Sequence, residues 1–300
     1  MTKIDLHQVD AFTDQLFGGN PAGVVTNADQ LSEHDMQNIA REMNLSETAF
    51  VCAPVASDAT VKLRYFTRSG DEVPFCGHAT VGTLAQLAQL NLFELGQPGT
   101  RAVRVETGIG VLDMEVVNGE RTQIIFTAPP VTLEPYSLQH QAFAKKLGVS
   151  AELLHPKAKI LRDTTLNYLY IPVASLKSLG EQTFDFNHIR KQFAAENTIV
   201  FCLYTRETIG KTADLHARSL APNIGIDEDP FTGSMQAGLV HAAKENNLVD
   251  PQQTTIATEQ GHFVGRPGSA MVHTTSDKTT VAAGAVPVFS TTMELNHETN

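Results

Sequence analysis

An internal repeat is the feature that most constrains the fold of this chain. A shift of 156 residues places the segment EVPFCGH, residues 72–78, on the segment EDPFTGS, residues 228–234, so that Glu, Pro, Phe and Gly coincide. An Arg-led segment precedes each copy, beginning at Arg64 in the first half and at Arg218 in the second. A repeat at such equivalent landmarks predicts a duplicated chain with two lobes of similar topology.

The distribution of apolar residues predicts many strands and one central helix in each half. Residues 77–90 are apolar on most faces, which is typical of a buried helix, and a second glycine-initiated helix is expected over residues 233–247. Short strands punctuated by Gly and Pro surround both helices, without the regular strand–helix alternation of a parallel α/β sheet. Pro129 and Pro130 indicate a hinge, so we place the division between the lobes near residues 118–130.

Composition and charge exclude several functional classes. With 33 acidic and 22 basic residues the net charge is −11, whereas nucleic-acid phosphates require a concentrated basic surface. The chain has no run of about 18 apolar residues that could span a membrane. Three cysteines in 300 residues do not form a disulfide framework. We therefore expect a protein of the reducing cytoplasm that binds neither nucleic acid nor membrane.

The short motifs of nucleotide and metal sites are incomplete in this chain. The GKT at residues 210–212 lacks the glycine that begins a phosphate-binding loop, and the GIG at residues 108–110 lacks the rest of a dinucleotide fingerprint. The eleven histidines show no H-x-H or H-E-x-x-H spacing, and the cysteines show no C-x-x-C spacing. We therefore expect no cofactor and no metal.

The two glycine-initiated helices suggest an anion site. A glycine at a helix start lets backbone N–H groups approach a ligand, and the helix dipole favours negative charge there. Gly77 and Gly233 would face each other across a cleft if a pseudo-twofold axis relates the lobes, and such a pair suits a small carboxylate. His78 and Asp229 are ionisable residues beside these turns. Either glycine alone is also consistent with a simple tight turn, and Glu47 alone with a solvated surface position.

Five longer stretches, spread over both halves, carry a resemblance to a known family. They are GNPAGV (19–24), MNLSETAF (43–50), RYFT (64–67), EVPFCGHAT (72–80) and RSLAPNIGIDEDPFTGS (218–234). Through them the chain resembles the phenazine-biosynthesis PhzF-like family, within the diaminopimelate-epimerase-like fold, over essentially its whole length.

The resemblance implies an α+β fold of two similar lobes related by a pseudo-twofold axis. Each lobe is expected to be a rolled, mostly antiparallel β-sheet or barrel around a central α-helix. The N-terminal lobe is expected at residues 1–118, joined by a C-terminal strand at about 284–300, and the C-terminal lobe at residues 130–283.

The resemblance also implies an activity and assigns roles to single residues. The activity is cofactor-independent isomerisation by proton transfer on a small carboxylate-bearing metabolite, in a homodimer, with the active site between the lobes. The acid/base residue falls on Glu47, with His78 and Asp229 as further catalytic residues. The resemblance places substrate-binding residues at the helix starts, on Gly77, Gly233 and Ser234. Ser46 is added as a substrate-binding residue because it is a hydroxyl donor beside Glu47.

Several residues depart from the patterns of the family and of its relatives. True diaminopimelate epimerases use two thiols; Cys76 stands where the first would be, but the second position is Thr232, whose hydroxyl cannot serve as the second base. We therefore expect Cys76 to be a packing residue. Arg68 and Met235 differ from residues common in the family and are candidates for an influence on substrate choice.

Two other functions stay open. An epimerase acting at a single stereocentre would use Glu47 on one face of the substrate and Cys76 or Asp229 on the other. A non-catalytic protein of the same fold would bind a small molecule or a partner without turnover. Isomer analysis of the products distinguishes the epimerase from the proton-shifting isomerase that the resemblance implies.

Overall fold

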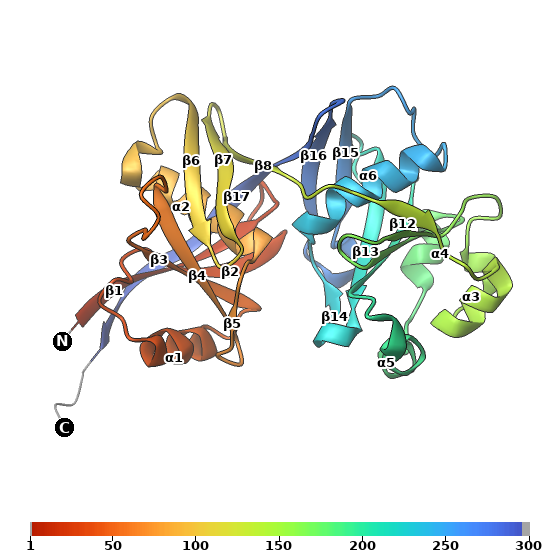
Figure 1. Ribbon diagram of the computed structural model, residues 1–300, viewed down its shortest axis with the longest axis horizontal. Helices are drawn as coiled ribbons and strands as arrows, with labels where there is room; N and C mark the ends of the chain where they lie inside the picture. Colours follow the sequence, from red (N-terminus) through yellow and green to blue (C-terminus); the bar gives the residue numbers. More distant parts are fainter. Residues whose placement is uncertain (1, 296–300) are drawn as a thin grey trace. The chain divides into compact units, whose positions relative to one another are not determined.

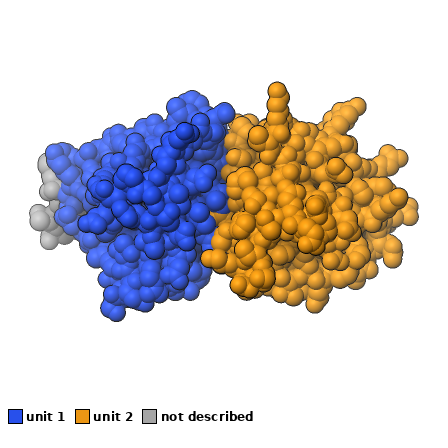
Figure 2. All heavy atoms as spheres, turned by 90° about the horizontal axis from the view of Figure 1, so that it is seen from above, with its two compact units in different colours: residues 1–127, 282–300 blue, residues 128–281 orange. Residues whose placement is uncertain are grey.

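The chain folds into two compact units, which Figure 2 colours separately. The computed structural model describes residues 2–295. Unit 1 comprises residues 1–127 and 282–300, and unit 2 comprises residues 128–281. The chain therefore leaves unit 1 once and returns to it within its last strand.

That last strand, β17 (Thr279–Leu295), runs antiparallel to β1 (Thr2–Ala11), so that Leu295 lies opposite Thr2. The final part of the expected C-terminal strand, residues 296–300, lies outside the described residues. Within residues 2–295, no helix is long and apolar enough to cross a membrane.

Unit 1 is built mainly from strands. Besides β1 and β17, these are β2 (Asn20–Val25), β3 (Glu47–Cys52), β4 (Val61–Thr67), β5 (Glu72–Val73), β6 (Gly99–Thr107), β7 (Gly110–Asn118) and β8 (Thr122–Thr127). Its helices are α1 (Glu33–Met43), α2 (Gly77–Gln89) and the 3-10 turn η1 (Leu92–Glu94).

Eight strands of unit 1 close into a barrel. Antiparallel pairs join β1 to β2, β3 to β4, β6 to β7, β7 to β8 and β17 to β1. Parallel pairs join β2 to β3 and β4 to β6, and β8 pairs with β17 to complete the circle. Figure 1 shows α2 among these strands.

The central helix α2 is buried along almost its whole length. Every residue from His78 to Ala88 is buried, because β1, β2, β3, β7 and β8 all pack against the helix. Two buried hydroxyls are satisfied within the helix, since Thr80 and Thr83 each donate a 2.7 Å hydrogen bond to the carbonyl four residues earlier. The predicted buried helix over residues 77–90 is therefore confirmed.

The outer helix α1 leads the chain into the segment that contains Glu47. Ser32 and Asp35 form a capping box that starts the helix, and Met36 and Ile39 face the core formed with β3 and β4. Asn44 ends the helix in the left-handed conformation, with φ of 51°. The chain then turns into β3 within three residues.

Unit 2 contains a second set of strands and more helices. The strands are β9 (Leu133–Pro135), β10 (Leu161–Asp163), β11 (Tyr168–Pro172), β12 (Val200–Thr205), β13 (Leu215–Ala221), β14 (Ile226–Asp229), β15 (Thr255–Gln260) and β16 (Gly268–Thr274). The α-helices are α3 (His140–Leu147), α4 (Leu176–Glu181), α5 (Phe186–Phe193) and α6 (Gln236–Glu245). The 3-10 turns are η2 (Ala151–Leu153), η3 (Ala194–Glu196), η4 (Pro222–Ile224), η5 (Gly233–Met235) and η6 (His262–Val264).

The strands of the two units pair in the same order. In unit 2, β10–β11, β12–β13 and β15–β16 are antiparallel, whereas β11–β12 and β13–β15 are parallel. This matches β1–β2, β3–β4 and β6–β7, with the parallel pairs β2–β3 and β4–β6, in unit 1. The predicted α+β fold, with two similar lobes of mostly antiparallel sheet around a helix, is confirmed.

A bidentate ion pair spans the hairpin before each central helix. Arg64 of β4 donates to Glu72 of β5 at 2.7 and 2.8 Å, and Arg218 of β13 donates to Glu228 of β14 at 2.9 and 2.7 Å. The two glutamates hold equivalent positions in the repeat. Arg218 also donates to two carbonyl groups at the end of α4, so the second pair is the more deeply buried.

Candidate active site

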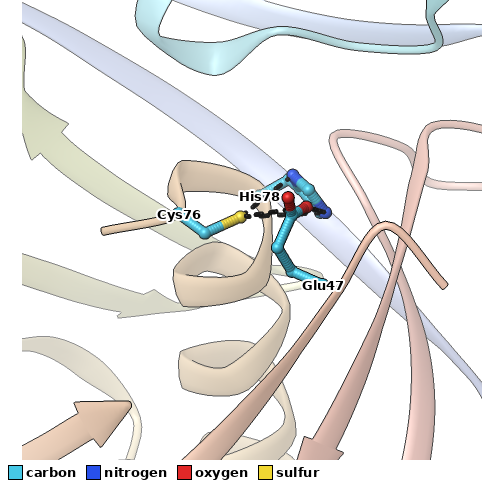
Figure 3. A group of neighbouring side chains, drawn as sticks. All are labelled: Glu47, Cys76 and His78. Carbon is cyan, nitrogen blue, oxygen red and sulfur yellow. Dashed lines mark hydrogen bonds and ion pairs between the residues drawn. The ribbon is translucent and has the colours of Figure 1, made fainter. Parts of the chain in front are cut away.

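Three side chains of unit 1 converge at the N-terminus of α2 (Figure 3). Glu47 is the first residue of β3 and lies opposite Thr67 of β4. Cys76 is the N-cap residue of α2, and His78 lies in its first turn. Since β4 pairs with β3 and the β4–β5 hairpin leads into α2, strand pairing holds the two parts of the cluster together.

The Glu47 carboxylate contacts both other side chains. Its Oε2 atom lies 3.3 Å from His78 Nε2 and 3.6 Å from Cys76 Sγ. The sulfur lies 3.3 Å from His78 Nδ1 and 3.9 Å from His78 Nε2. Cys76 is buried, as a packing residue would be, but its sulfur contacts the two ionisable side chains.

Burial and ring chemistry suit this cluster to proton transfer. The side chains of Glu47 and His78 are only 15% and 10% exposed, so each polar group depends on its protein neighbours. With a proton on Nε2 the imidazole donates to the Glu47 carboxylate; with the proton on Nδ1 it points a donor at Cys76. The ring can therefore stabilise either a charged or a protonated carboxyl group.

The predicted binding residues of unit 1 lie around the same point. Ser46 Oγ lies 3.2 Å from His78 Nε2. At Gly77 the nearest atom to an added Cβ would be 4.0 Å away, so the space beside the helix start is open. The side chain of the N-cap residue Cys76 makes no capping hydrogen bond to the first-turn N–H groups. These features suit an anion at the start of α2.

The second copy of the repeat forms a polar turn in unit 2. Asp229 ends β14, and its Oδ2 atom accepts a 2.5 Å hydrogen bond from Thr232 Oγ1. Thr232 Oγ1 also lies 2.8 Å from Ser219 Oγ. Gln260 donates to the Asp229 carbonyl at 2.8 Å and accepts from the Thr232 N–H at 3.2 Å. Thr232 therefore anchors the Asp229 carboxylate.

Two members of this network were not predicted from the sequence. Ser219 directly follows Arg218, so the matching of Arg-led strands in the repeat could have identified it. Gln260 lies about 30 residues away at the end of β15, and no local motif marks it.

The remaining candidates of unit 2 lie just beyond this turn. Gly233 begins η5 rather than an α-helix, and η5 continues directly into α6, which starts at Gln236. Ser234 Oγ lies 2.9 Å from the Tyr168 hydroxyl, another residue that the sequence did not indicate. Met235 is completely buried, so it belongs to the core of unit 2.

Arg68, the other departure from the family pattern, lies exposed just after β4 in unit 1. Its backbone N–H donates to the carbonyl of Ser46 at 3.3 Å. Each unit thus brings its own predicted residues together: Ser46, Glu47, Gly77 and His78 in unit 1, and Asp229, Gly233 and Ser234 in unit 2.

Comparison with known proteins places this geometry in context. The PhzC-PhzF family model, described as phenazine biosynthesis-like protein, matches residues 9–291. An uncharacterized isomerase of Clostridium acetobutylicum is 32% identical, over 98% of this chain and 99% of the relative. The crystal structure of a PhzF-family phenazine biosynthesis protein from Bacillus anthracis is 26% identical and covers 98% of this chain and 100% of that chain, with a TM-score of 0.86.

A more distant likeness concerns the fold alone. A probable proline racemase from Agrobacterium radiobacter is 9% identical, with a TM-score of 0.63 over 98% of this chain and 93% of that chain.

Proposed function

The chain belongs to the phenazine biosynthesis-like protein family, and we propose that it moves a proton between two carbons of a small carboxylate-bearing metabolite without a cofactor. Its curated relatives bear the name isomerase, which confirms the predicted enzyme class.

The observation that carries the proposal is the contact between the Glu47 carboxylate and the His78 imidazole at the start of α2. In the proposed step Glu47 takes a proton from a C–H bond, and the electron pair of that bond becomes part of a shifted double bond. Glu47 then returns the proton at the other end of the shifted system. Substrate and product have the same atoms, so no other reactant is needed.

The neighbouring groups support both halves of this step. Before the substrate binds, His78 stabilises the Glu47 carboxylate by donating a hydrogen bond to it. When the carboxyl group becomes protonated, the His78 ring can change its tautomer and accept a hydrogen bond from it. The N–H groups at the start of α2, with Ser46, would bind the substrate carboxylate. Positioned acid–base groups of this kind accelerate proton transfer by about 10²–10⁴-fold.

We assign Asp229, Gly233 and Ser234 of unit 2 to the same reaction, as residues that orient and polarise the substrate. The support is the family resemblance and the fixed geometry of the Asp229 carboxylate beside Thr232. Coupling is the test. If Asp229 and Glu47 act on one substrate molecule, the rate loss of Asp229→Asn combined with Glu47→Gln will be smaller than the product of the two single losses.

A second candidate function is favoured by the position of Cys76. Its sulfur lies 3.6 Å from Glu47 Oε2, too close for the two groups to stand on opposite faces of one carbon, so epimerisation at one stereocentre would use the thiol on one face and Asp229 on the other. Chiral analysis of the products separates the candidates: epimerisation inverts one centre, whereas the proposed isomerisation moves a double bond.

Solvent deuterium incorporation tests the proposal without knowledge of the physiological substrate. Small carboxylates that contain an acidic C–H bond, both saturated amino acids and unsaturated acids, are incubated with the protein in deuterated buffer and followed by NMR. We expect exchange with at least one class, and a loss of about 10²–10⁴-fold in Glu47→Gln. Glu42→Gln, a matched change of an exposed residue in α1, is the control. Equal exchange rates in Glu47→Gln and Glu42→Gln would contradict the role of Glu47.

The resemblance also supports a homodimer as part of this proposal. Light scattering on the purified protein is then expected to give twice the 32.5 kDa mass of the chain. A mass of one chain at micromolar concentration would contradict it.

A further inference from the structure

We propose that Glu47, Cys76 and His78 also form a binding site for a thiophilic divalent cation, Zn²⁺ above all, and that the bound ion inhibits the enzyme. The binding part of this inference stands on the geometry of unit 1 alone. The inhibition part rests on the proposed function, because it requires Glu47 to be the proton carrier.

The distances between the three ligand atoms match those of a tetrahedral zinc site. Cys76 Sγ, Glu47 Oε2 and His78 Nε2 form a triangle with edges of 3.6, 3.3 and 3.9 Å. Usual zinc bonds to sulfur, nitrogen and oxygen predict edges of about 3.5 Å for S···O, 3.3 Å for N···O and 3.6 Å for S···N. A point about 2.1 Å from all three atoms lies in the plane of this triangle, and shortening the S···N edge by about 0.3 Å would move the ion out of that plane towards tetrahedral geometry.

The donor set selects the kind of ion. A thiolate, an imidazole and one carboxylate form the mixture of soft and intermediate ligands that zinc prefers, whereas Mg²⁺ and Ca²⁺ require several oxygen ligands. The charges also balance, since thiolate and carboxylate together neutralise a divalent ion in a mostly buried site. On binding, the Cys76 thiol loses one proton to solvent and its sulfur forms the bond to the metal.

The His78 imidazole can adopt the tautomer that a metal ion requires. Nε2 must be unprotonated to bind the ion, which leaves the ring proton on Nδ1, 3.3 Å from the sulfur. Three protein ligands leave one position of a tetrahedral ion for water or another small ligand. The bound ion would occupy Glu47 Oε2 and draw negative charge from the whole carboxylate, so that Glu47 becomes a weaker base and isomerisation slows.

A second group of side chains, in unit 2, is a weaker competitor. His216, Glu259 and His262 also lie close enough to share an ion. However, the Glu259 carboxylate already accepts hydrogen bonds from His216 Nδ1 at 2.7 Å and from two backbone N–H groups at 2.6 and 2.8 Å. An ion there would have to displace these bonds, and it would gain no thiolate ligand.

Cobalt titration of the reduced, metal-free protein tests the site without any turnover assay. Tetrahedral Co²⁺ with a thiolate ligand gives a sulfur-to-cobalt charge-transfer band in the near ultraviolet. We expect one equivalent of Co²⁺ to produce this band in the wild type and in Cys52→Ala, a matched control cysteine of the same unit. Cys76→Ala should lose the band, and its affinity for Zn²⁺, measured by displacement of a chromogenic chelator, should fall by about 100-fold or more.

Three results would overturn the metal site. One is the absence of the charge-transfer band in the wild type, and another is its persistence in Cys76→Ala. The third is stoichiometric cobalt binding that His262→Ala abolishes and Cys76→Ala leaves intact, which would place the ion in unit 2.

The inhibition is measured separately, by deuterium exchange with an accepted substrate. One equivalent of Zn²⁺ should reduce the exchange rate at least about 10-fold, EDTA should restore it, and Mg²⁺ should have no effect. A cobalt band together with unchanged exchange in the presence of zinc would confirm the metal site and contradict Glu47 as the proton carrier. Failure of the two proposals is thus distinguishable.

Discussion

The two Arg–Glu ion pairs of the repeat allow one mutation to be tested against its own structural equivalent. Arg218 and Glu228 are 9% and 10% exposed in their side chains, whereas Arg64 and Glu72 are 23% and 40% exposed. Arg218 also stacks against Phe184, with the guanidinium carbon 4.8 Å from the ring centroid. The same change, Glu to Gln, therefore removes a buried partner in unit 2 and a half-exposed one in unit 1.

The expected magnitudes differ severalfold. Glu228→Gln leaves the Arg218 guanidinium buried without its counter-charge, and breaking a buried pair from one side costs about 3–5 kcal/mol. For a unit of this size 1 kcal/mol corresponds to about 2–4 °C in Tm, so we expect unit 2 to melt roughly 10 °C lower. Glu72→Gln should cost about 1 kcal/mol or less, because Arg64 keeps an ion pair with Glu33 at 2.9 Å.

Differential scanning calorimetry of the full chain, with urea unfolding followed by circular dichroism, measures both effects. Because Glu228 directly precedes Asp229 in β14, the destabilised variant should also lose activity, whereas Glu72→Gln should retain more of it. Equal losses of stability in the two variants would refute the argument that burial, rather than the presence of an ion pair, sets the cost.

Two further predictions concern packing and pH. Gly238→Ala should lower the free energy of unfolding, measured with a chemical denaturant, by about 1–3 kcal/mol, because the added Cβ would overlap the Tyr170 hydroxyl. Gly82→Ala, at the equivalent position of the repeat, should be neutral or stabilising, because its Cβ would meet only ordinary contacts from 3.5 Å. A larger loss of stability at Gly82 than at Gly238 would contradict this. Burial raises the pKa of Glu196, but the hydrogen bonds from Lys146 and a tyrosine hydroxyl outweigh it and leave that pKa below its usual value. A carboxyl group whose pKa is lowered by folding stabilises the protein above its unfolded-state pKa, and this contribution is lost as the pH falls through the folded-state pKa. The free-energy difference between wild type and Glu196→Gln should therefore be largest near pH 6 and shrink towards pH 3; a constant difference would contradict the assignment.

Much of the fold could be predicted from the sequence, because the duplication leaves a long-range repeat. The local pattern of apolar and polar residues alone would not have indicated two similar lobes. The repeat around Gly77 and Gly233 predicted two similar lobes, and the apolar run that follows Gly77 predicted the buried helix. The family is confirmed over residues 9–291, since its motifs are long and occur in a fixed order.

Residues 137–148 were predicted to be partly helical, which agrees with α3, but the short helices α4 and α5 of unit 2 were not predicted. α5 has only eight residues, capped by Asp185 and anchored by Ile189 and Phe193 one turn apart. Such a short segment has too little periodicity to distinguish it from a strand. Its stability comes from the core that it shares with α3 and β12, and this contact is not visible in a local window.

The candidate site shows the same limit. Glu47 and Cys76 are 29 residues apart in the chain, and only the pairing of β3 with β4 and the start of α2 bring their side chains together. The sequence analysis argued against a metal from motif spacing, which considers only ligands that lie near one another in the sequence. Such spacing could not detect this cluster.

The central claim, that Glu47 carries the proton, is tested most directly by comparing Glu47→Gln with Cys76→Ala. The measurement is the rate of solvent deuterium incorporation into one accepted substrate, followed by NMR in metal-free buffer, with substrate binding measured in parallel by calorimetry. We predict that Glu47→Gln binds substrate but exchanges about 10²–10⁴-fold more slowly, whereas Cys76→Ala stays within about 10-fold of the wild type. Wild-type exchange in Glu47→Gln together with no exchange in Cys76→Ala would show that the thiol carries the proton and would contradict the account.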